Sequence, residues 1–412
     1  MRSFYARYLS KLTLFLILLA PIGRAAGAPI RVTTYNILNF PDALGSQRLD
    51  DLRAAMSFIT PDIVVVQEIQ SNEGVSLFLD SVMHHVSSTF ASAPFNDGPD
   101  TDNALFYRTD RIDYLGAQYH TTPNRDIAEY RMIVSETQSE LYLFSIHFKA
   151  SQGATNESIR LQEATVLRNR LDALPAGSNF IVAGDFNIYY SEEPAFQKLT
   201  DSLVNVTGRL IDPLDITGTW HENSYYASAH TQSTRVDQLP DGGATGGMDD
   251  RFDMILCSDG VMNSTGLYFV ENSYAICGND GEHFNLAVNF GYNGAVPADV
   301  AEALYWASDH LPVSVDLDDE VVSSIDEQMV KVWPNPLQDY ADVILPWHED
   351  FTRARITMTN ILGQRVYENE TFDPGGLRLQ RGNLPVGVYF LHAVIETHFG
   401  HYEYRTNVAV IK

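Results

Sequence analysis

The sequence has few cysteines, few basic residues and no long apolar run beyond its first 28 positions. Its 412 residues include 2 cysteines, and 27 lysine and arginine residues stand against 53 aspartate and glutamate residues, for a net charge of -26. Because nucleic-acid-binding proteins usually present basic surface to phosphates, this charge argues against tight, non-specific binding of DNA or RNA. It does not exclude catalysis on a phosphoester, since a bound divalent cation neutralises phosphate locally.

The first residues have the composition of a secretory signal peptide. Basic residues within the first eleven positions precede an apolar run over residues 12–20, and small residues fill positions 25–28. A transmembrane anchor is the alternative, but the run is about half of the roughly 20 residues that a spanning helix needs. We therefore expect residues 1–28 to be removed and the mature protein to be secreted or held at the cell surface, without stable membrane insertion.

The two cysteines are interpreted in the light of the expected export. In an exported protein an even number of cysteines predicts disulfide bonding, so we expect a bridge between Cys257 and Cys277. Two unpaired, buried thiols are the alternative.

Length and composition fit two globular domains. A chain of 412 residues exceeds what one hydrophobic core usually organises, and 45% hydrophobic with 19% charged residues is typical of folded protein. Residues 29–317 alternate β-rich apolar runs with helical periods, which predicts an α/β layer architecture. The expected strands cover residues 30–35, 63–67, 104–108, 141–148, 180–183, 252–257 and 311–315, and the expected helices cover 49–59 and 159–174.

The remaining segments are less regular. Residues 217–248 are rich in Gly, Ser, Thr and aromatic residues without clear periodicity, which predicts a long surface loop. Residues 318–331 are acidic and polar, and we interpret them as a linker. Residues 332–412 show short strands separated by Gly, Asn and Pro, which favours a small all-β sandwich.

Polar residues stand at the ends of the predicted strands of the first domain. Metal-dependent phosphodiester cleavage needs oxygen ligands for a hard cation, an oriented water and donors for the charge that develops on phosphate. Each residue alone is a weak signal, because a lone glutamate after a strand is usually a cap and a lone histidine in a strand usually a core residue. The residues in these positions are Asn36, Glu68, His147, Asp185, Asn187, Asp309 and His310.

Taken together and in order, these residues resemble the endonuclease/exonuclease/phosphatase superfamily, which includes exonuclease III, pancreatic deoxyribonuclease and bacterial sphingomyelinase. The resemblance implies a four-layer sandwich of two packed β-sheets flanked by helices. It depends on the blocks TYNILNF (34–40), VVVQEI (64–69), IHFKAS (146–151), VAGDFN (182–187) and SDHLPV (308–313). Because they span nearly the whole first domain in the family's order, chance agreement is implausible.

The same resemblance implies the metal ligands. Glu68 resembles the main ligand, and Asn36 and Asp309 resemble groups at or near the cation. The expected ion is Mg²⁺, with Mn²⁺ or Ca²⁺ as alternatives.

Catalytic roles also follow from the resemblance. His310 is similar to the histidine that activates water or binds the scissile phosphate, and Asp253 to the carboxylate that fixes its tautomer and raises the basicity of its other nitrogen. Asp185 resembles a general acid or orienter of water, Asn187 a phosphate-binding neighbour, and His147 a second histidine that faces the phosphate. Lys149 and Arg131 are expected to add positive charge there, although Arg131 has a plain surface or salt-bridge role as its alternative.

Within the superfamily the HFKAS block looks most like secreted bacterial nucleases with HFKSK, from which Ala150 departs. We therefore expect an extracellular nuclease that acts on DNA or RNA. The enzyme alternative is a phosphodiesterase for lipid head groups or small phosphoesters, which the acidic composition favours. A non-catalytic surface binding protein is the other alternative, and the presence of every expected ligand and both histidines argues against it.

The last 80 or so residues resemble the C-terminal sorting domain of type IX secretion substrates from the Bacteroidetes. The blocks VWPNP (332–336), ITMTNILGQRVY (356–367) and LPVGVYFL (384–391) carry this resemblance. It implies the type IX secretion machinery as a partner. A carbohydrate-binding or adhesive β-sandwich is the alternative.

Overall fold

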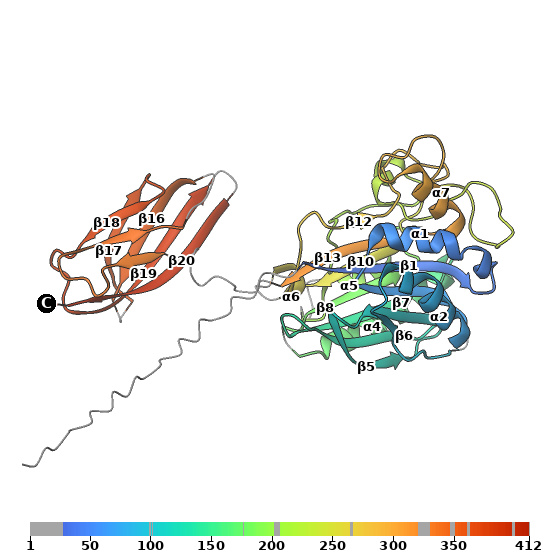
Figure 1. Cartoon of the computed structure of the whole chain (residues 1–412), viewed down its shortest axis with the longest axis horizontal. Helices are drawn as coiled ribbons and strands as arrows, with labels where there is room; N and C mark the ends of the chain where they lie inside the picture. Colours follow the sequence, from blue (N-terminus) through green and yellow to red (C-terminus); the bar gives the residue numbers. More distant parts are fainter. Residues whose placement is uncertain are drawn as a thin grey trace, which may run out of the picture. The chain divides into compact units, whose positions relative to one another are not determined.

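The computed structural model describes residues 28–98, 100, 102–175, 177–201, 207–263, 267–319, 330–346, 351–360, 363–397 and 400–411. The predicted signal peptide, apart from its last residue, and most of the predicted linker lie outside these residues. The chain divides into two compact units between Val321 and Val322 (Figure 1). Each unit has its own hydrophobic core. The strands that flank the predicted linker extend into it, since one continues to Asp319 and the next begins at Lys331.

Two mixed β-sheets form the centre of the first unit. The seven-stranded sheet has the order β11-β13-β1-β2-β4-β3, with β12 also paired to β13, and the six-stranded sheet has the order β5-β6-β7-β8-β10-β9. The first contains β1 (Ile30–Phe40), β2 (Ile63–Ile69), β3 (Phe90–Ser92), β4 (Asp102–Arg108), β11 (Leu267–Phe269), β12 (Ala275–Ile276) and β13 (Val313–Asp319). The second contains β5 (Ile112–His120), β6 (Ile127–Val134), β7 (Ser139–His147), β8 (Phe180–Asp185), β9 (Leu210–Ile211) and β10 (Asp253–Ser258).

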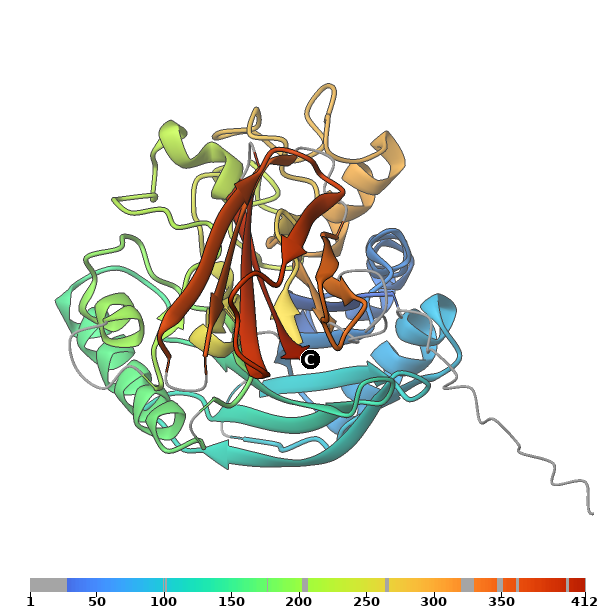
Figure 2. The same cartoon turned by 90° about the vertical axis from the view of Figure 1, so that its left-hand side faces the viewer.

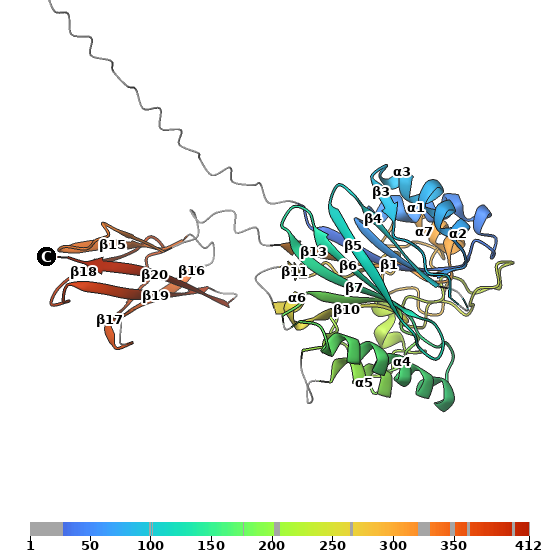
Figure 3. The same cartoon turned by 90° about the horizontal axis from the view of Figure 1, so that it is seen from below.

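Helices cover the outer face of each sheet. Figure 3 shows α1 and α4 on the outer sides of the two sheets. On the seven-stranded sheet Leu52 and Met56 of α1 pack with residues of β1 and β2, and on the six-stranded sheet Leu167 and Leu171 of α4 pack with residues of β7 and β8. The helices are α1 (Leu49–Ile59), α2 (Asn72–Phe78), α3 (His84–Val86), α4 (Ala154–Asp172), α5 (Pro194–Thr200), α6 (Asp259–Asn263) and α7 (Ala298–Ala307), with short helical turns at Gly45–Gln47, Leu79–Met83 and Ser224–Ala229. The four-layer sandwich expected from the sequence is confirmed.

The alternation of side chains along β2 shows how the layers form. Ile63 and Val65 belong to the core between the two sheets, whereas Val64 and Val66 belong to the core beneath the helices. Successive side chains of a strand point to opposite faces, so a continuous β-branched run is buried on both sides, as its sequence predicts.

The structure differs from the sequence-based expectations in several segments. The hairpin of β5 and β6 and helix α7 were not predicted from the sequence. Residues 217–248 are largely irregular, as expected, but Thr231 and Arg235 within them are fully buried, so this segment is not simply a surface loop. The predicted disulfide is wrong. Cys257 is buried between the sheets, Cys277 packs near α1 and α7, and both thiols are free.

The second unit is the all-β sandwich expected from its sequence, and its strands are the orange-to-red arrows of Figure 2. A three-stranded sheet (β14-β15-β18) and a four-stranded sheet (β17-β16-β19-β20) enclose one apolar core. The strands are β14 (Lys331–Trp333), β15 (Tyr340–Ile344), β16 (Phe351–Thr359), β17 (Arg365–Thr371), β18 (Gly376–Gln380), β19 (Gly387–Thr397) and β20 (Gly400–Val410). Among the helices of the described residues, none has the length and apolar character needed to cross a membrane.

Candidate active site

Strand ends gather polar side chains at one edge of the two sheets. β1 runs parallel to β2, with Asn36 opposite Gln67, and β7 runs parallel to β8, with His147 opposite Asp185. β10 is antiparallel to β8 and begins at Asp253, directly opposite Asp185. Because an antiparallel strand begins where its neighbour ends, these side chains emerge at the same edge.

A buried polar layer joins the sheets beneath this edge. The amide of Gln67 donates to Ser145 Oγ across the sheets at 3.2 Å and accepts from Thr34 Oγ1 at 3.1 Å. Ser145 Oγ in turn donates to Asn103 Oδ1 at 3.0 Å. Since buried polar groups are costly unless they are paired, this chain of hydrogen bonds fixes the spacing of the sheets below the site.

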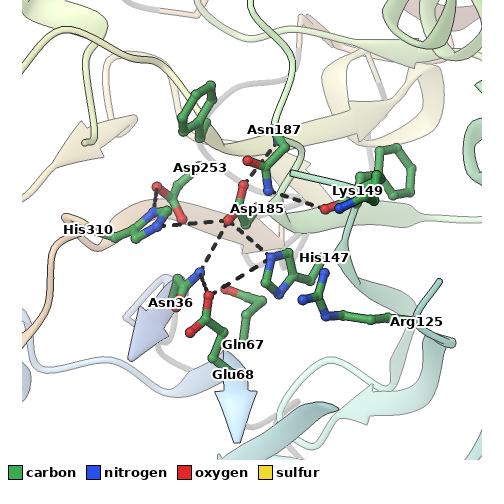
Figure 4. A network of polar contacts seen from close by, with 12 residues as sticks. Asn36, Gln67, Glu68, Arg125, His147, Lys149, Asp185, Asn187, Asp253 and His310 are labelled. Carbon is green, nitrogen blue, oxygen red and sulfur yellow. Dashed lines mark hydrogen bonds and ion pairs between the residues drawn. The ribbon is translucent and has the colours of Figure 1, made fainter. Parts of the chain in front are cut away.

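Asn36 links the two sheets at the site itself. Its Nδ2 donates to Glu68 Oε1 at 3.0 Å and to Asp185 Oδ2 at 3.2 Å (Figure 4). Glu68 has a φ of 65°, and the pairing of β1 with β2 shifts register beyond Asn36. Such an irregularity redirects a side chain out of the ordinary alternation, and here the Glu68 carboxylate lies against Asn36.

His310 and Asp253 form a buried pair. His310 Nδ1 lies 2.7 Å from Asp253 Oδ2, and Asp253 is fully buried. Burial opposes a charge on His310, but the carboxylates of Asp253 and Asp309 outweigh it, so the pKa of His310 lies well above its usual value. A histidine held in this way offers its other nitrogen, Nε2, as a strong proton acceptor.

Asp185 lies between two imidazoles. Its Oδ2 is 3.5 Å from His147 Nε2 and 3.9 Å from His310 Nε2 (Figure 4). Burial raises the pKa of Asp185 to about 7, against the lowering effect of His310. Burial also holds the pKa of His147 well below its usual value, and the charge of Arg125 adds to that effect. The site therefore combines imidazoles and carboxylates whose proton affinities differ from their values in water.

Asp309 is held by a loop that returns over the site. Its Oδ2 accepts from the main-chain N–H of Ala244 at 2.6 Å and from Gln232 Nε2 at 3.3 Å. Gly243 packs so closely on this carboxylate that an added Cβ would lie 3.0 Å from Asp309 Cγ. A larger residue at position 243 would therefore displace Asp309 or the loop.

The donor set fits the chemistry of a hard divalent cation. Asn36, Glu68 and Asp309 supply amide and carboxylate oxygens, which hard cations prefer, and the Glu68 side chain keeps 16% exposure. Within the described ranges, no three carboxylate, imidazole or thiol side chains already surround a common point.

Asn187 and Lys149 follow the ends of β8 and β7. The main-chain N–H of Asn187 donates to Asp185 Oδ1 at 3.0 Å, and its amide donates to the Phe148 carbonyl at 3.2 Å. The main-chain N–H of Lys149 donates to the buried carboxyl of Glu163 at 2.9 Å. Burial raises the pKa of Glu163 to about 7 despite this hydrogen bond.

The structure places Arg131 away from the site, so the expectation that it contributes charge there is corrected. Arg131 lies on β6, its neighbours Tyr130 and Met132 face the core between the sheets, and its own side chain therefore points to the opposite face. There it forms an ion pair with Glu140 and is 54% exposed.

Arg125 is the arginine that reaches the site. It precedes β6, lies beside His147 in Figure 4, and pairs with Asp100 at 2.8 Å while its side chain remains 15% exposed. Sequence reasoning missed it. The available signal was an arginine inside the polar turn 124–126, directly before a strand.

A buried ion pair connects the segments that follow β7 and β8. Arg160 of α4 and Glu193 have no exposed side-chain surface, and Arg160 Nη2 donates to Glu193 Oε2 at 3.2 Å. Arg160 Nη1 also donates to the carbonyls of Lys149 and Ser151 at 2.7 and 2.8 Å. The helix thus holds the main chain that carries Lys149.

Family profiles match most of the chain. Residues 33–310 match the profile described as Endonuclease/Exonuclease/phosphatase family, and residues 331–399 match the one described as Secretion system C-terminal sorting domain. A comparison with curated protein sequences found no significant match.

Solved structures with a similar fold include D. rerio TDP2 complexed with single strand DNA product, the human Nocturnin catalytic domain with bound sulfate anion, and an endonuclease/exonuclease/phosphatase family protein from Bacteroides thetaiotaomicron. Their sequence identities to the chain are 14%, 20% and 16%, and the TM-scores are 0.47, 0.44 and 0.45. The alignments cover 71%, 72% and 72% of this chain and 100%, 96% and 100% of those chains.

Proposed function

The chain belongs to the endonuclease/exonuclease/phosphatase family, and from this premise we propose that it is a metal-dependent extracellular nuclease that hydrolyses DNA or RNA. Family membership makes it a hydrolase of phosphoesters, and the sorting domain makes it a secreted or cell-surface protein that uses the secretion machinery. The observation that carries the proposal is the unbroken set of contacts from Glu68 through Asn36 and Asp185 to His310.

In the proposed reaction His310 accepts a proton from the attacking water at Nε2. Asp253 holds the opposite ring nitrogen, which fixes the tautomer and raises the basicity of Nε2. Asp185, which accepts hydrogen bonds from Asn36 and from the main chain of Asn187, orients the attacking water.

The residues that we propose to bind phosphate lie on the side of the site that carries His147. We assign it to Asn187, Lys149 and His147, as expected from the sequence, and to Arg125 in place of Arg131. A divalent ion held by Glu68 with Asn36 and Asp309 would supply charge neutralisation at the phosphate and polarisation of its P–O bonds.

The catalytic unit is proposed to end before the sorting domain. The apolar core of the second unit contains only residues from Val330 onward among those described, and the cores of the first unit contain none of them. We therefore propose that the catalytic domain, expected over residues 29–317, extends to Asp319, and that the sorting domain, expected over residues 332–412, begins by Val330.

A substrate panel tests the proposed function. The purified protein should degrade circular DNA or RNA in magnesium, and a chelator should abolish the activity. A second candidate, a phosphodiesterase for lipid head groups or small phosphoesters, is favoured by the net charge of -26. Hydrolysis of sphingomyelin or bis(p-nitrophenyl) phosphate with both nucleic acids left intact would reject the nuclease in favour of that candidate.

The proposed metal site predicts a rescue experiment. Glu68→Gln keeps the shape of the side chain but removes the charge of the main ligand, so metal affinity should fall by at least about 10-fold, and high metal concentration should partly restore activity. Calorimetric titration with Mn²⁺ measures the affinity without relying on turnover. Glu73→Gln, an exposed glutamate on α2, is the matched control. Equal Mn²⁺ affinity in both variants would remove Glu68 from the metal site.

The placement of the two arginines predicts opposite kinetic results. Arg125→Met should raise KM about 10-fold or more, because a charge-assisted hydrogen bond to phosphate contributes about 1.5–3 kcal/mol. Arg131→Met should leave KM nearly unchanged, since Arg131 is on the outer face of the sheet and paired with Glu140. Steady-state kinetics give the KM of each variant. A larger rise in KM for Arg131→Met than for Arg125→Met would contradict the assignment of phosphate binding to Arg125.

A further inference from the structure

The carboxamide of Gln232 lies between Asp309 and His310. Its Nε2 is 2.6 Å from His310 Nε2 and 3.3 Å from Asp309 Oδ2. A carboxamide nitrogen carries two hydrogens, so it can donate one to Asp309 and, when the ring is neutral with its hydrogen on Nδ1, the other to His310 Nε2. His310 Nδ1 already faces Asp253, so Gln232 contacts the ring nitrogen that faces the reaction.

The main chain holds Gln232 firmly although it belongs to no strand. Its N–H donates to the Asp250 carbonyl at 3.1 Å, and the N–H groups of Asp249 and Asp250 both donate to its carbonyl at 2.9 Å. An isolated β-bridge also joins it to His310. The flanking Thr231 and Ser233 are buried, whereas Gln232 itself remains partly exposed. Its side chain is therefore positioned by a rigid backbone and is still open to a ligand.

Two other amides near the reacting groups also donate within the protein. Asn36 Nδ2 donates to both Glu68 and Asp185, whereas Asn187 Nδ2 donates one of its two hydrogens, to the Phe148 carbonyl. Arg125 and Lys149 belong to the side of the site that carries His147. On the opposite side, beside His310, Gln232 is a neutral donor that an arriving phosphate oxygen can reach.

We propose that Gln232 is a further catalytic residue, whose amide N–H binds a non-bridging oxygen of the scissile phosphate. This inference deepens the proposed function and depends on it. When the phosphate oxygen takes the hydrogen bond, Gln232 Nε2 no longer donates to His310 Nε2, which is then free to accept the proton of water. One side chain, Gln232, thus couples the binding of phosphate to the freeing of His310 Nε2 for proton transfer. Fixed donors of this kind act on charge that develops in the transition state.

The test compares Gln232→Ala with Gln238→Ala, a matched control in the same segment whose exposed amide donates only to the Leu239 and Gly243 carbonyls among the contacts of the described chain. The substrate is the p-nitrophenyl ester of thymidine 5′-phosphate in magnesium. Gln232→Ala should lower kcat about 100-fold with little change in KM, as for loss of one oxyanion donor. Gln238→Ala should keep kcat within about twofold. If Gln232→Ala does not fold, Gln232→Glu, which has the same shape but presents a carboxylate to the phosphate, serves instead and should be at least as impaired.

Phosphorothioate substrates separate a direct contact from a structural role. Sulfur is a poor hydrogen-bond acceptor, so replacing the oxygen that Gln232 contacts should slow the wild-type protein, and that thio effect should shrink in Gln232→Ala for one of the Rp and Sp isomers only. A structural role would lower both isomers equally and leave both thio effects unchanged, which would overturn the inference, as would wild-type kcat in Gln232→Ala. If the inference is overturned in this way while the wild type is active and His310→Ala is inactive, the proposed function is still supported. A wild type without activity on this ester and on the nucleic acids would overturn both.

Discussion

His310→Ala is expected to lower kcat by at least about 100-fold while the fold remains intact, because the variant lacks the group that accepts the proton of the attacking water. Substrate binding should change less, since other side chains also hold the phosphate. Steady-state kinetics at saturating magnesium give both values. His85→Ala, which removes an exposed histidine from α3, is the control and should behave like wild type.

Asp253→Asn should have the same kind of effect and a somewhat smaller one. It keeps the shape of the side chain 2.7 Å from His310 Nδ1 but removes the charge that sets the imidazole tautomer. Because the pair acts as one unit, the double variant should be scarcely worse than His310→Ala alone. Additive losses in kcat would refute the pairing, and an unaffected kcat in His310→Ala would refute the assignment of the site.

Arg160→Met is expected to lower the free energy of unfolding by about 3–5 kcal/mol, because it leaves the charge of Glu193 buried without a partner. It also removes the donors to the carbonyls of Lys149 and Ser151. Calorimetry of the full chain should show a lower Tm for the transition of the catalytic unit, with the transition of the sorting domain unchanged.

A second substitution separates the charge from the packing. Arg160→Met/Glu193→Met should be less destabilised than Arg160→Met alone, since no ion remains buried in the double variant. Arg209→Met is the matched control, because Arg209 and Asp259 lie 3.7 Å apart with side chains that are 28% and 64% exposed. An exposed pair of this kind contributes about 1 kcal/mol or less. Equal stability of Arg160→Met and Arg209→Met would show that the buried pair does not brace the site.

The strand-end residues were accessible to sequence analysis because their signals are local. Glu68 follows a continuous β-branched run, and Asp185 follows an apolar run that ends at glycine. Once each run is interpreted as a strand, the polar residue at its end is placed at the edge of a sheet. The contact of Asn36 with both carboxylates also depends on the packing of the two sheets, because Glu68 belongs to the seven-stranded sheet and Asp185 to the six-stranded one.

Arg131 was misplaced because its environment depends on strand phase. β6 was not predicted, and in a strand a shift of one residue exchanges the two faces. Tyr130 and Met132 occupy the core between the sheets, which leaves Arg131 on the far side. The expected bridge between Cys257 and Cys277 failed for a related reason. Two cysteines in one chain satisfy a compositional rule, but a disulfide also requires that the fold bring their Cβ atoms close together.

The sequence by itself determined the α/β character of the first unit and the all-β character of the second, because apolar periodicity is a property of short segments. The four-layer architecture, the sorting domain and the order of the site residues followed from resemblance to family motifs, which are also short segments. Only the tertiary structure decided which side chains from irregular segments complete the site. Gln232 is 78 residues from His310 in sequence, and it reaches that ring because its main chain pairs with Asp250 and with His310. Arg125 lies beside His147 although it belongs to the turn that precedes β6 (Figure 4). Such contacts depend on how distant segments pack, which no local pattern specifies.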